Sequence, residues 1–263
     1  MAHVFSLAGR HALVTAATTP LARALAVGLA EAGANVSVTT LHDDRAEEVL
    51  ANSILNECWA AGAKGQAKTV DLTDPAAVEA AVAALERDVA PIDILVNAAH
   101  GANVKPLLEV SLADWQRELS RNVTTVFVAS QAVGRRMLPR GRGRIINIVS
   151  DVHDRGVPNC ALFAASQGAV LALTRSLGIE WGRGEATVED RVTVNALGVG
   201  FYEEVAGPQQ DEELHAILQR YIPLRRLGTP ADLQGALVYL ASNVANFIQG
   251  ELLVVDGAIA NHA

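Results

Sequence analysis

The sequence is poor in cysteine, in aromatic side chains and in basic residues, and each shortage excludes a class of protein. Its two cysteines, Cys58 and Cys160, are too few for a disulfide framework and lack the spacing of metal ligands, so we expect packed thiols and no metal site. With 21 Lys and Arg against 29 Asp and Glu, the net charge of −8 argues against nucleic acid or an anionic membrane surface as a partner.

The sequence also lacks the patterns that are typical of a signal peptide and of a membrane helix. The first residues do not combine a charged segment with an apolar core, so no signal peptide is predicted. No uninterrupted apolar run approaches the roughly 18 residues that a membrane helix needs. Because half of the residues are hydrophobic and only 19% are charged, the chain can bury a large core. These features predict a cytoplasmic protein with no membrane partner.

Short apolar runs alternate with segments of helical period along the whole chain, and no linker divides them. This alternation is typical of βαβ crossovers, which build parallel sheets. We therefore expect an α/β fold, a Rossmann-type doubly wound parallel sheet of about seven strands with helices on both faces, in a single domain over residues 1–263. The expected strands are residues 11–15, 35–39, 65–70, 92–97, 144–149, 191–196 and 251–257.

The first strand-to-helix turn is the place where such a fold binds the pyrophosphate of a dinucleotide, and glycines normally shape it. Here Ala16, Pro20 and Ala22 occupy the positions of those glycines. Thr19 and Pro20 form a good helix start, but the proline ring removes an N–H and adds bulk where the anion would lie. The sequence therefore predicts an intact helix with a damaged anion site.

The end of the second expected strand carries no cofactor signal either. Thr39 and Thr40 stand where an acidic residue would bind the ribose of NAD and where a basic residue would favour NADP. From the two positions together we expect no bound cofactor, with NAD or NADP as the alternative.

Several motifs agree in order and spacing over nearly the whole chain. They are "DLTD" (71–74), "DILVNAAHG" (93–101), "RNV" (121–123), "GRIINIVS" (143–150) and "FAASQGAVLALTRSLGIEW" (163–181). With these motifs the sequence resembles the short-chain dehydrogenase/reductase family. The resemblance implies an adenine-side contact for Asp71, cofactor-binding positions at Asn97 and Ala99, and catalytic positions at Asn122 and Ser150. It also implies a substrate lid at about residues 200–228.

The family's reaction depends on a tyrosine thirteen residues after the serine and a lysine four residues later, on one face of a helix. The ammonium lowers the pKa of the phenol, which then transfers the proton that accompanies the hydride. Phe163 and Gln167 occupy these positions. The chain has only three tyrosines and three lysines, and no Tyr–Lys pair at helical spacing, so a shifted alignment does not restore the pair.

Three functional hypotheses follow from these replacements. The leading one is a degenerate family member without NAD(P)-dependent turnover, acting as a non-catalytic subunit or ligand-binding partner of an active homologue. The second is an NAD(P)-dependent oxidoreductase with a rewired proton relay, which uses Ser150 with His153 or a water. The third is a cofactor-free lyase, isomerase or hydrolase in which His100 and His153 act in the old substrate pocket.

Assembly is the remaining expectation from the resemblance. In the family, the helices equivalent to residues 111–137 and 163–181 and the last strand build subunit interfaces, and these segments are apolar here. We therefore expect a homo-oligomer, a dimer or tetramer, or else a hetero-oligomer with an active homologue. A small-molecule ligand is compatible with either assembly.

Overall fold

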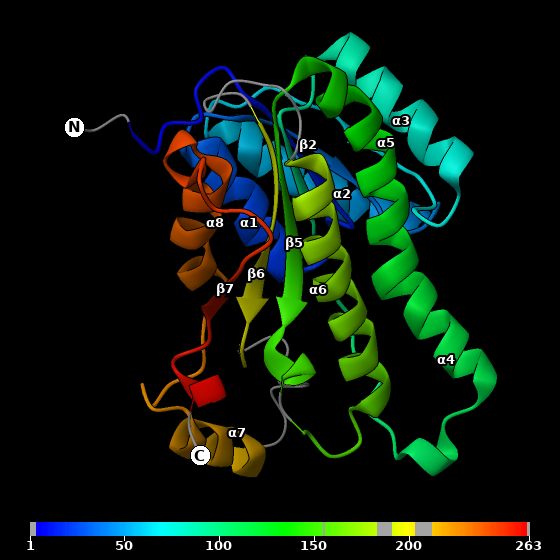
Figure 1. Cartoon of the computed structure of the whole chain (residues 1–263), viewed down its shortest axis with the longest axis vertical. Helices are drawn as coiled ribbons and strands as arrows, with labels where there is room; N and C mark the ends of the chain where they lie inside the picture. Colours follow the sequence, from blue (N-terminus) through cyan, green and yellow to red (C-terminus); the bar gives the residue numbers. More distant parts are fainter. Residues whose placement is uncertain (1–3, 155, 183–190, 203–211, 262–263) are drawn as a thin grey trace.

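The computed structural model describes residues 4–154, 156–182, 191–202 and 212–261 of the chain. Within them, seven parallel strands form one sheet in the order β3-β2-β1-β4-β5-β6-β7 (Figure 1). This order is the doubly wound arrangement, because the chain starts in the middle of the sheet and builds outward in both directions. The expected fold class is confirmed.

The strands lie close to their predicted positions. β1 and β2 match the prediction, β5 and β6 extend beyond it, β4 and β7 are shorter than expected, and β3 is reduced to two residues. β3 is an edge strand that pairs only with the end of β2, through Val38 and Thr39. The strands are β1 (His11–Thr15), β2 (Asn35–Thr39), β3 (Ala67–Lys68), β4 (Ile94–Asn97), β5 (Gly143–Ser150), β6 (Val192–Val199) and β7 (Leu252–Val255).

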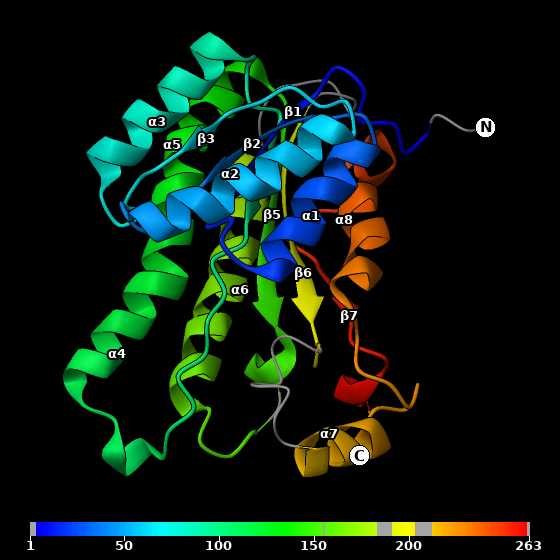
Figure 2. The same ribbon diagram turned by 180° about the vertical axis from the view of Figure 1, so that it is seen from behind.

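Helices cover both faces of the sheet, as Figures 1 and 2 show from opposite sides. One core cluster joins α1, α2 and α8 to the sheet, and a second joins α3 and α5 to the other face. A π-helical turn at Ser120–Thr124 connects α4 to α5. The helices are α1 (Pro20–Glu31), α2 (Arg45–Ala60), α3 (Pro75–Asp88), α4 (Leu112–Leu119), α5 (Thr125–Arg140), α6 (Ala161–Trp181), α7 (Glu212–Tyr221) and α8 (Gln234–Ala241).

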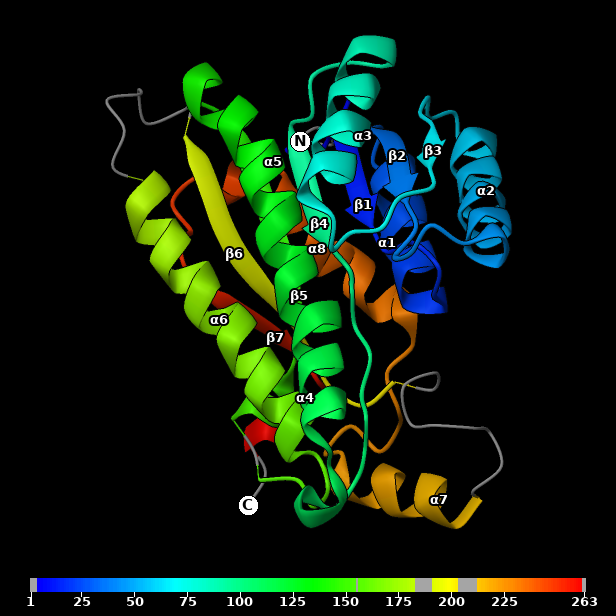
Figure 3. The same cartoon turned by 90° about the vertical axis from the view of Figure 1, so that its right-hand side faces the viewer.

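Helix α6 is long and apolar enough, by length and composition alone, to cross a membrane, which the sequence analysis did not expect. Its apolar residues have another explanation in the fold. Val170 and Leu171 pack with Val149 of β5 and Ala196 of β6 in a buried cluster. The composition of α6 therefore reflects its position on the sheet beside α5 (Figure 3).

The strand directions define two different edges of the molecule. All seven strands are parallel, so their carboxyl ends lie along one edge and their amino ends along the opposite edge. Helix α7 lies beyond the carboxyl ends of β5 and β6 (Figure 1). Ligands of doubly wound sheets bind outside the carboxyl ends, near the point where the strand order reverses. The edge at β1, β4 and β5 is therefore where the site belongs.

Two glycines of α6 provide a matched test of how tightly this helix packs. A Cβ on Gly178 would lie 2.9 Å from backbone atoms of Gly250, whereas a Cβ on Gly168 would meet no atom within 4 Å. We expect Gly178→Ala to lower the free energy of unfolding by about 1–3 kcal/mol, since the backbone must move. Gly168→Ala is expected to raise it by up to about 1 kcal/mol, because alanine favours helix. Urea denaturation of both variants measures the difference, and equal effects would contradict the close approach.

Candidate active site

The turn between β1 and α1 keeps a backbone conformation that suits glycine, although it contains none. Ala16 has a φ of 50°, in the left-handed region that costs an L-residue roughly 1–2 kcal/mol. Thr19 is the N-cap of α1, its Oγ1 accepting from the backbone N–H of Ala22 at 3.2 Å, and Pro20 is the first helical residue. The turn thus retains the shape of a dinucleotide site while Pro20 removes one of its donors.

Beside this turn, the ends of β2 and β3 provide polar groups of two kinds. Thr39 Oγ1 is buried and has no hydrogen-bond partner among the described residues. Thr40 Oγ1 instead bonds both the N–H and the carbonyl of Val70. The Asp71 carboxylate accepts from the N–H and the hydroxyl of Thr73, which lowers the pKa of Asp71. An unpartnered hydroxyl and a fixed carboxylate at this edge fit a nucleotide's ribose and adenine.

Asn97, a cofactor-binding position by resemblance, turns its side chain into the protein. Its Nδ2 donates to Ser130 Oγ at 3.1 Å and to Asn147 Oδ1 at 2.8 Å, and Asn147 donates in turn to Thr174. Asn97 therefore ties β4 to β5, α5 and α6 and fixes the loop that follows β4. Ala99, in that loop, is buried and offers only its backbone.

Four other predicted positions do meet, in one buried hydrogen-bond network at the end of β5. The Oε1 atom of Gln167 accepts from the N–H of Ser150 at 2.9 Å, and its Nε2 donates to Ser166 Oγ at 3.3 Å. Ser166 Oγ also accepts a hydrogen bond from Asn122 Nδ2 at 3.0 Å and donates one to the carbonyl of Phe163 at 2.7 Å. Gln167, at the position of the family's lysine, therefore links the end of β5 to Ser166 of α6.

The network continues to a buried carboxylate that the sequence analysis missed. Asn122, within the π-helical turn, donates to Glu118 Oε1 at 3.0 Å and to the carbonyl of Gly101 at 2.9 Å. Glu118 pairs with Arg121 at 2.7 Å, and burial raises its pKa. Such π turns recur at functional sites. The sequence signal that could have identified Glu118 was its charge at a position of α4 that faces the protein interior.

His100 lies in the loop after β4 and contacts the ring that replaces the phenol. The imidazole and Phe163 rings meet edge-on, with centroids 5.2 Å apart and an interplanar angle of 88°. The Nε2 atom of His100 is buried without a hydrogen-bond partner among the described residues. Burial, assisted by the positive charge of Arg121, lowers the pKa of His100 from 6.5 to about 4. The imidazole is therefore neutral at pH 7.

The remaining predictions concern segments that are described only in part. The backbone of His153 lies in a short 3-10 turn after β5, but its side chain falls outside the described part, as do residues 203–211 of the expected lid. At the lid's base, Tyr202 pairs with Gly228, and its hydroxyl donates to the carbonyl of Val255 at 2.8 Å. In the described ranges, no group of three or more potential metal ligands comes together.

The comparisons with known proteins first identify the class. The family model described as Enoyl-(Acyl carrier protein) reductase matches residues 16–259. The chain belongs to the short-chain dehydrogenase/reductase family, as the motifs indicated.

Individual relatives are similar over their full length. The chain is 40% identical to gluconate 5-dehydrogenase of Gluconobacter oxydans over 97% of this chain and 96% of the relative. It is 35% identical to 5-keto-D-gluconate 5-reductase of Escherichia coli, covering 98% of both. The crystal structure of a gluconate 5-dehydrogenase from Burkholderia cenocepacia in complex with NADP and tartrate matches with a TM-score of 0.90 at 33% identity, covering 99% of both chains.

These relatives correct the leading functional hypothesis. A non-catalytic subunit was expected because Phe163 and Gln167 replace the family's acid and ammonium, but relatives of 35–40% identity over the whole chain carry the names of active dehydrogenases and reductases. The expectation of no cofactor is likewise disfavoured, since a solved relative holds NADP. The expectation of a non-catalytic subunit rested on side-chain replacements such as Phe163 and Gln167. It did not include the buried hydrogen-bond network that joins Ser150, Ser166 and Asn122 around them.

The lowered pKa of His100 makes stability depend on pH. Between about 4 and 6.5 the unfolded chain binds a proton at this position that the folded chain does not, so the free energy of unfolding falls as the pH falls through that window. We expect a loss of about 2–3 kcal/mol from this group.

Thermal unfolding at pH 7 and pH 5 measures about 2 kcal/mol of this loss, because pH 5 lies inside the window. His100→Gln should reduce the difference between the two pH values, whereas the exposed His42, as His42→Gln, should preserve most of it. Some acid sensitivity will remain in both variants because burial also lowers the pKa of His11. An unchanged difference in His100→Gln would contradict the assignment.

Proposed function

We propose that the protein is an NAD(P)-dependent oxidoreductase that interconverts a hydroxyl and a keto group of a sugar acid. The full-length similarity to gluconate 5-dehydrogenase and 5-keto-D-gluconate 5-reductase is the observation that carries this proposal. The retained geometry at the end of β5 supports it, since Ser150 and Asn122 share one rigid network. We also propose a cytoplasmic location, which the relatives' activities suit.

The residues present fit NADP at the carboxyl edge. The left-handed turn at Ala16 and the start of α1 would hold its pyrophosphate, and Thr39 and Asp71 lie where its ribose and adenine belong. Neither Thr39 nor Thr40, at the end of β2, carries a charge that would repel a 2′-phosphate. When bound, NADP would take a hydride from the carbinol carbon or return one to the ketone. We therefore propose NADP in preference to NAD.

The proton that accompanies the hydride needs a carrier other than tyrosine. We propose His100, since its imidazole touches Phe163 and has an unpartnered, buried Nε2. The neutral imidazole would accept a proton from a substrate hydroxyl during oxidation, and the imidazolium would return it during reduction. Because burial holds the pKa of His100 at about 4, oxidation is the direction that starts from the form populated at pH 7. The Ser150 hydroxyl would orient the substrate oxygen. Because the buried Gln167 side chain is uncharged, it needs no counter-charge in the site, as a buried lysine would.

Exposed apolar side chains support self-association through the α4–α5 and α6 surfaces. Leu112, Trp115, Phe127 and Ile179 are among the large hydrophobic residues left exposed in the single chain. Large apolar side chains exposed on neighbouring helices are a feature of protein–protein contact surfaces. We propose a homo-oligomer, and light scattering of the purified protein would measure its mass.

The test of the proposed function is direct. The purified protein is expected to oxidise NADPH with 5-keto-D-gluconate and to reduce NADP with gluconate, and to quench NADPH fluorescence saturably with a higher affinity than for NADH. Binding without turnover on any sugar acid would refute the reaction but leave the nucleotide site. Absence of both would refute the whole proposal.

Removing the proposed proton carrier should lower the rate without affecting nucleotide binding. His100→Gln is expected to reduce kcat by about 10²–10⁴-fold, the usual contribution of a general acid–base group, while the Kd for NADPH stays within twofold. Phe163→Tyr combined with Gln167→Lys in the His100→Gln background should restore much of the rate by rebuilding the family's pair. Full activity of His100→Gln alone would contradict the role of His100.

Pro20 offers a separate test of the nucleotide turn, with a matched control in the same protein. Pro20 and Pro75 are both first helical residues after a capping side chain, in α1 and α3. Pro20→Gly is expected to tighten NADPH binding several-fold, because it restores an N–H at the pyrophosphate position. Pro75→Gly should leave the Kd unchanged. Fluorescence titration decides, and equal affinities for all three proteins would rule out the contact.

A further inference from the structure

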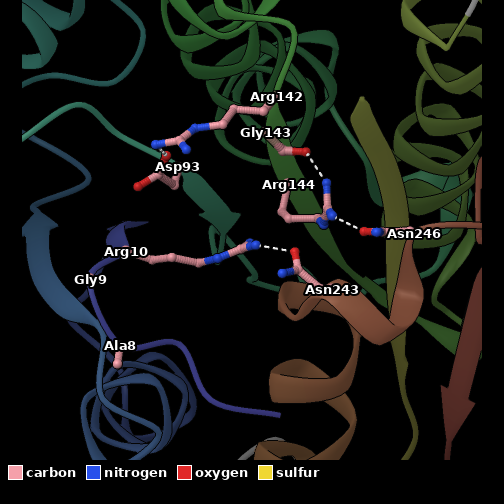
Figure 4. A pocket seen from close by; sticks show the side chains of 9 residues that line it. All are labelled: Ala8, Gly9, Arg10, Asp93, Arg142, Gly143, Arg144, Asn243 and Asn246. Carbon is pink, nitrogen blue, oxygen red and sulfur yellow. Dashed lines mark hydrogen bonds and ion pairs between the residues drawn. The ribbon is translucent and has the colours of Figure 1, made fainter. Parts of the chain in front are cut away.

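A cavity of about 490 Å³ lies at the edge of the sheet opposite the candidate active site, where the strands begin. It is lined by the segment that leads into β1, by the residues that precede β4 and start β5, and by the connection between α8 and β7 (Figure 4). Its volume is in the range of small-molecule sites. None of the residues assigned to the active site lines it.

The lining carries an excess of positive charge. Arg10, Arg142 and Arg144 contribute three guanidinium groups, and Asp93 is the one carboxylate among the lining residues, which leaves a formal charge of +2. This is unusual for a chain with a net charge of −8. Concave surfaces of one sign concentrate ions of the other.

The single carboxylate of the lining is already engaged. Asp93 Oδ1 pairs with Arg142 at 3.1 Å, and its Oδ2 accepts from the N–H of His11 at 3.2 Å. Arg10 has only neutral acceptors among the described residues, the carbonyl of Ala241 at 3.0 Å and Asn243 Oδ1. Arg10 is half-buried, and burial lowers the pKa of its guanidinium while the nearby Asp93 carboxylate acts in the opposite direction. A positive charge in this setting gains from an anion.

The two asparagines make the cavity a set of donors. Asn243 and Asn246 turn their Oδ1 atoms to Arg10 and Arg144. No acceptor for their Nδ2 groups is found among the described residues. Guanidinium and amide N–H groups are the donors that bind oxyanions.

We propose that this cavity is a binding site for a multiply charged oxyanion, either a phosphate group or a di- or tricarboxylate, separate from the active site. The ligand joins Arg142 to Arg10, which already donates to the end of α8 and to the α8–β7 connection through the carbonyl of Ala241 and Asn243 Oδ1. Because it binds the folded chain alone, it stabilises the protein in proportion to its concentration.

Thermal unfolding and calorimetry of the whole protein test the site, with potassium phosphate and potassium citrate as probes and potassium chloride at matched ionic strength as the control. We expect a saturable rise in Tm with at least one probe and none with chloride. A response to phosphate alone assigns a phosphate ligand, and a response to citrate alone assigns a carboxylate ligand. Equal responses to all three salts would overturn the proposal.

Charge variants distinguish this cavity from binding elsewhere. Arg10→Gln and Arg142→Gln should each weaken the probe about tenfold, and Asp93→Asn should tighten it by removing the competing carboxylate. Arg23→Gln, which removes an exposed arginine paired with Glu57 on the surface of α1 and α2, is the matched control and should bind as the wild type does. Should Arg10→Gln unfold, Arg142→Gln and Asp93→Asn still give shifts of opposite sign. Unchanged affinity in these two variants would refute the site.

Discussion

The buried hydrogen-bond network that runs from Glu118 through Asn122 and Ser166 to Gln167 is the constraint on which the active site depends. It joins the π-helical turn between α4 and α5 to helix α6 and, through the N–H of Ser150, to the end of β5. Each member is buried. Since an unsatisfied buried polar group costs about 1–3 kcal/mol, no member can be removed without disturbing the others. The network thus holds the end of β5 and helix α6 together through buried hydrogen bonds.

Against that rigid frame, the replacement of tyrosine and lysine changes chemistry more than shape. Gln167 keeps the long polar side chain that reaches back to β5, but gives up the charge. Phe163 keeps the ring and its packing, and His100 now lies edge-on against it. The family has two titratable groups here, a tyrosine and a lysine. This chain has neither at positions 163 and 167, and the imidazole of His100 is the titratable group that contacts Phe163. The hydrogen-bond network at the end of β5 is therefore present, while both ionisable side chains of the family's pair are absent.

The two edges of the sheet differ in how their charged side chains are paired. At the carboxyl edge, charged groups such as Glu118 and Arg121 are paired with each other and serve the network. At the amino edge, Asp93 pairs with Arg142 and is the one carboxylate beside three arginines in the cavity lining, so charge of one sign accumulates. The proposed reaction and the proposed anion site thus lie at opposite edges of the same sheet.

The sequence by itself determined the sheet, because apolar runs of strand length alternate with amphipathic helices, and it located Asn122, Ser150, Phe163 and Gln167 through their spacing. It also signalled an unusual turn at Ala16, whose positive φ the structure shows. Only the tertiary structure decided that Asn97 faces inward, that His100 contacts Phe163, and that Glu118 is buried beside Asn122. It also brought together the arginines of the amino edge. The physical reason is that periodicity encodes which face of an element is apolar, whereas contacts between residues distant in sequence depend on how the layers pack.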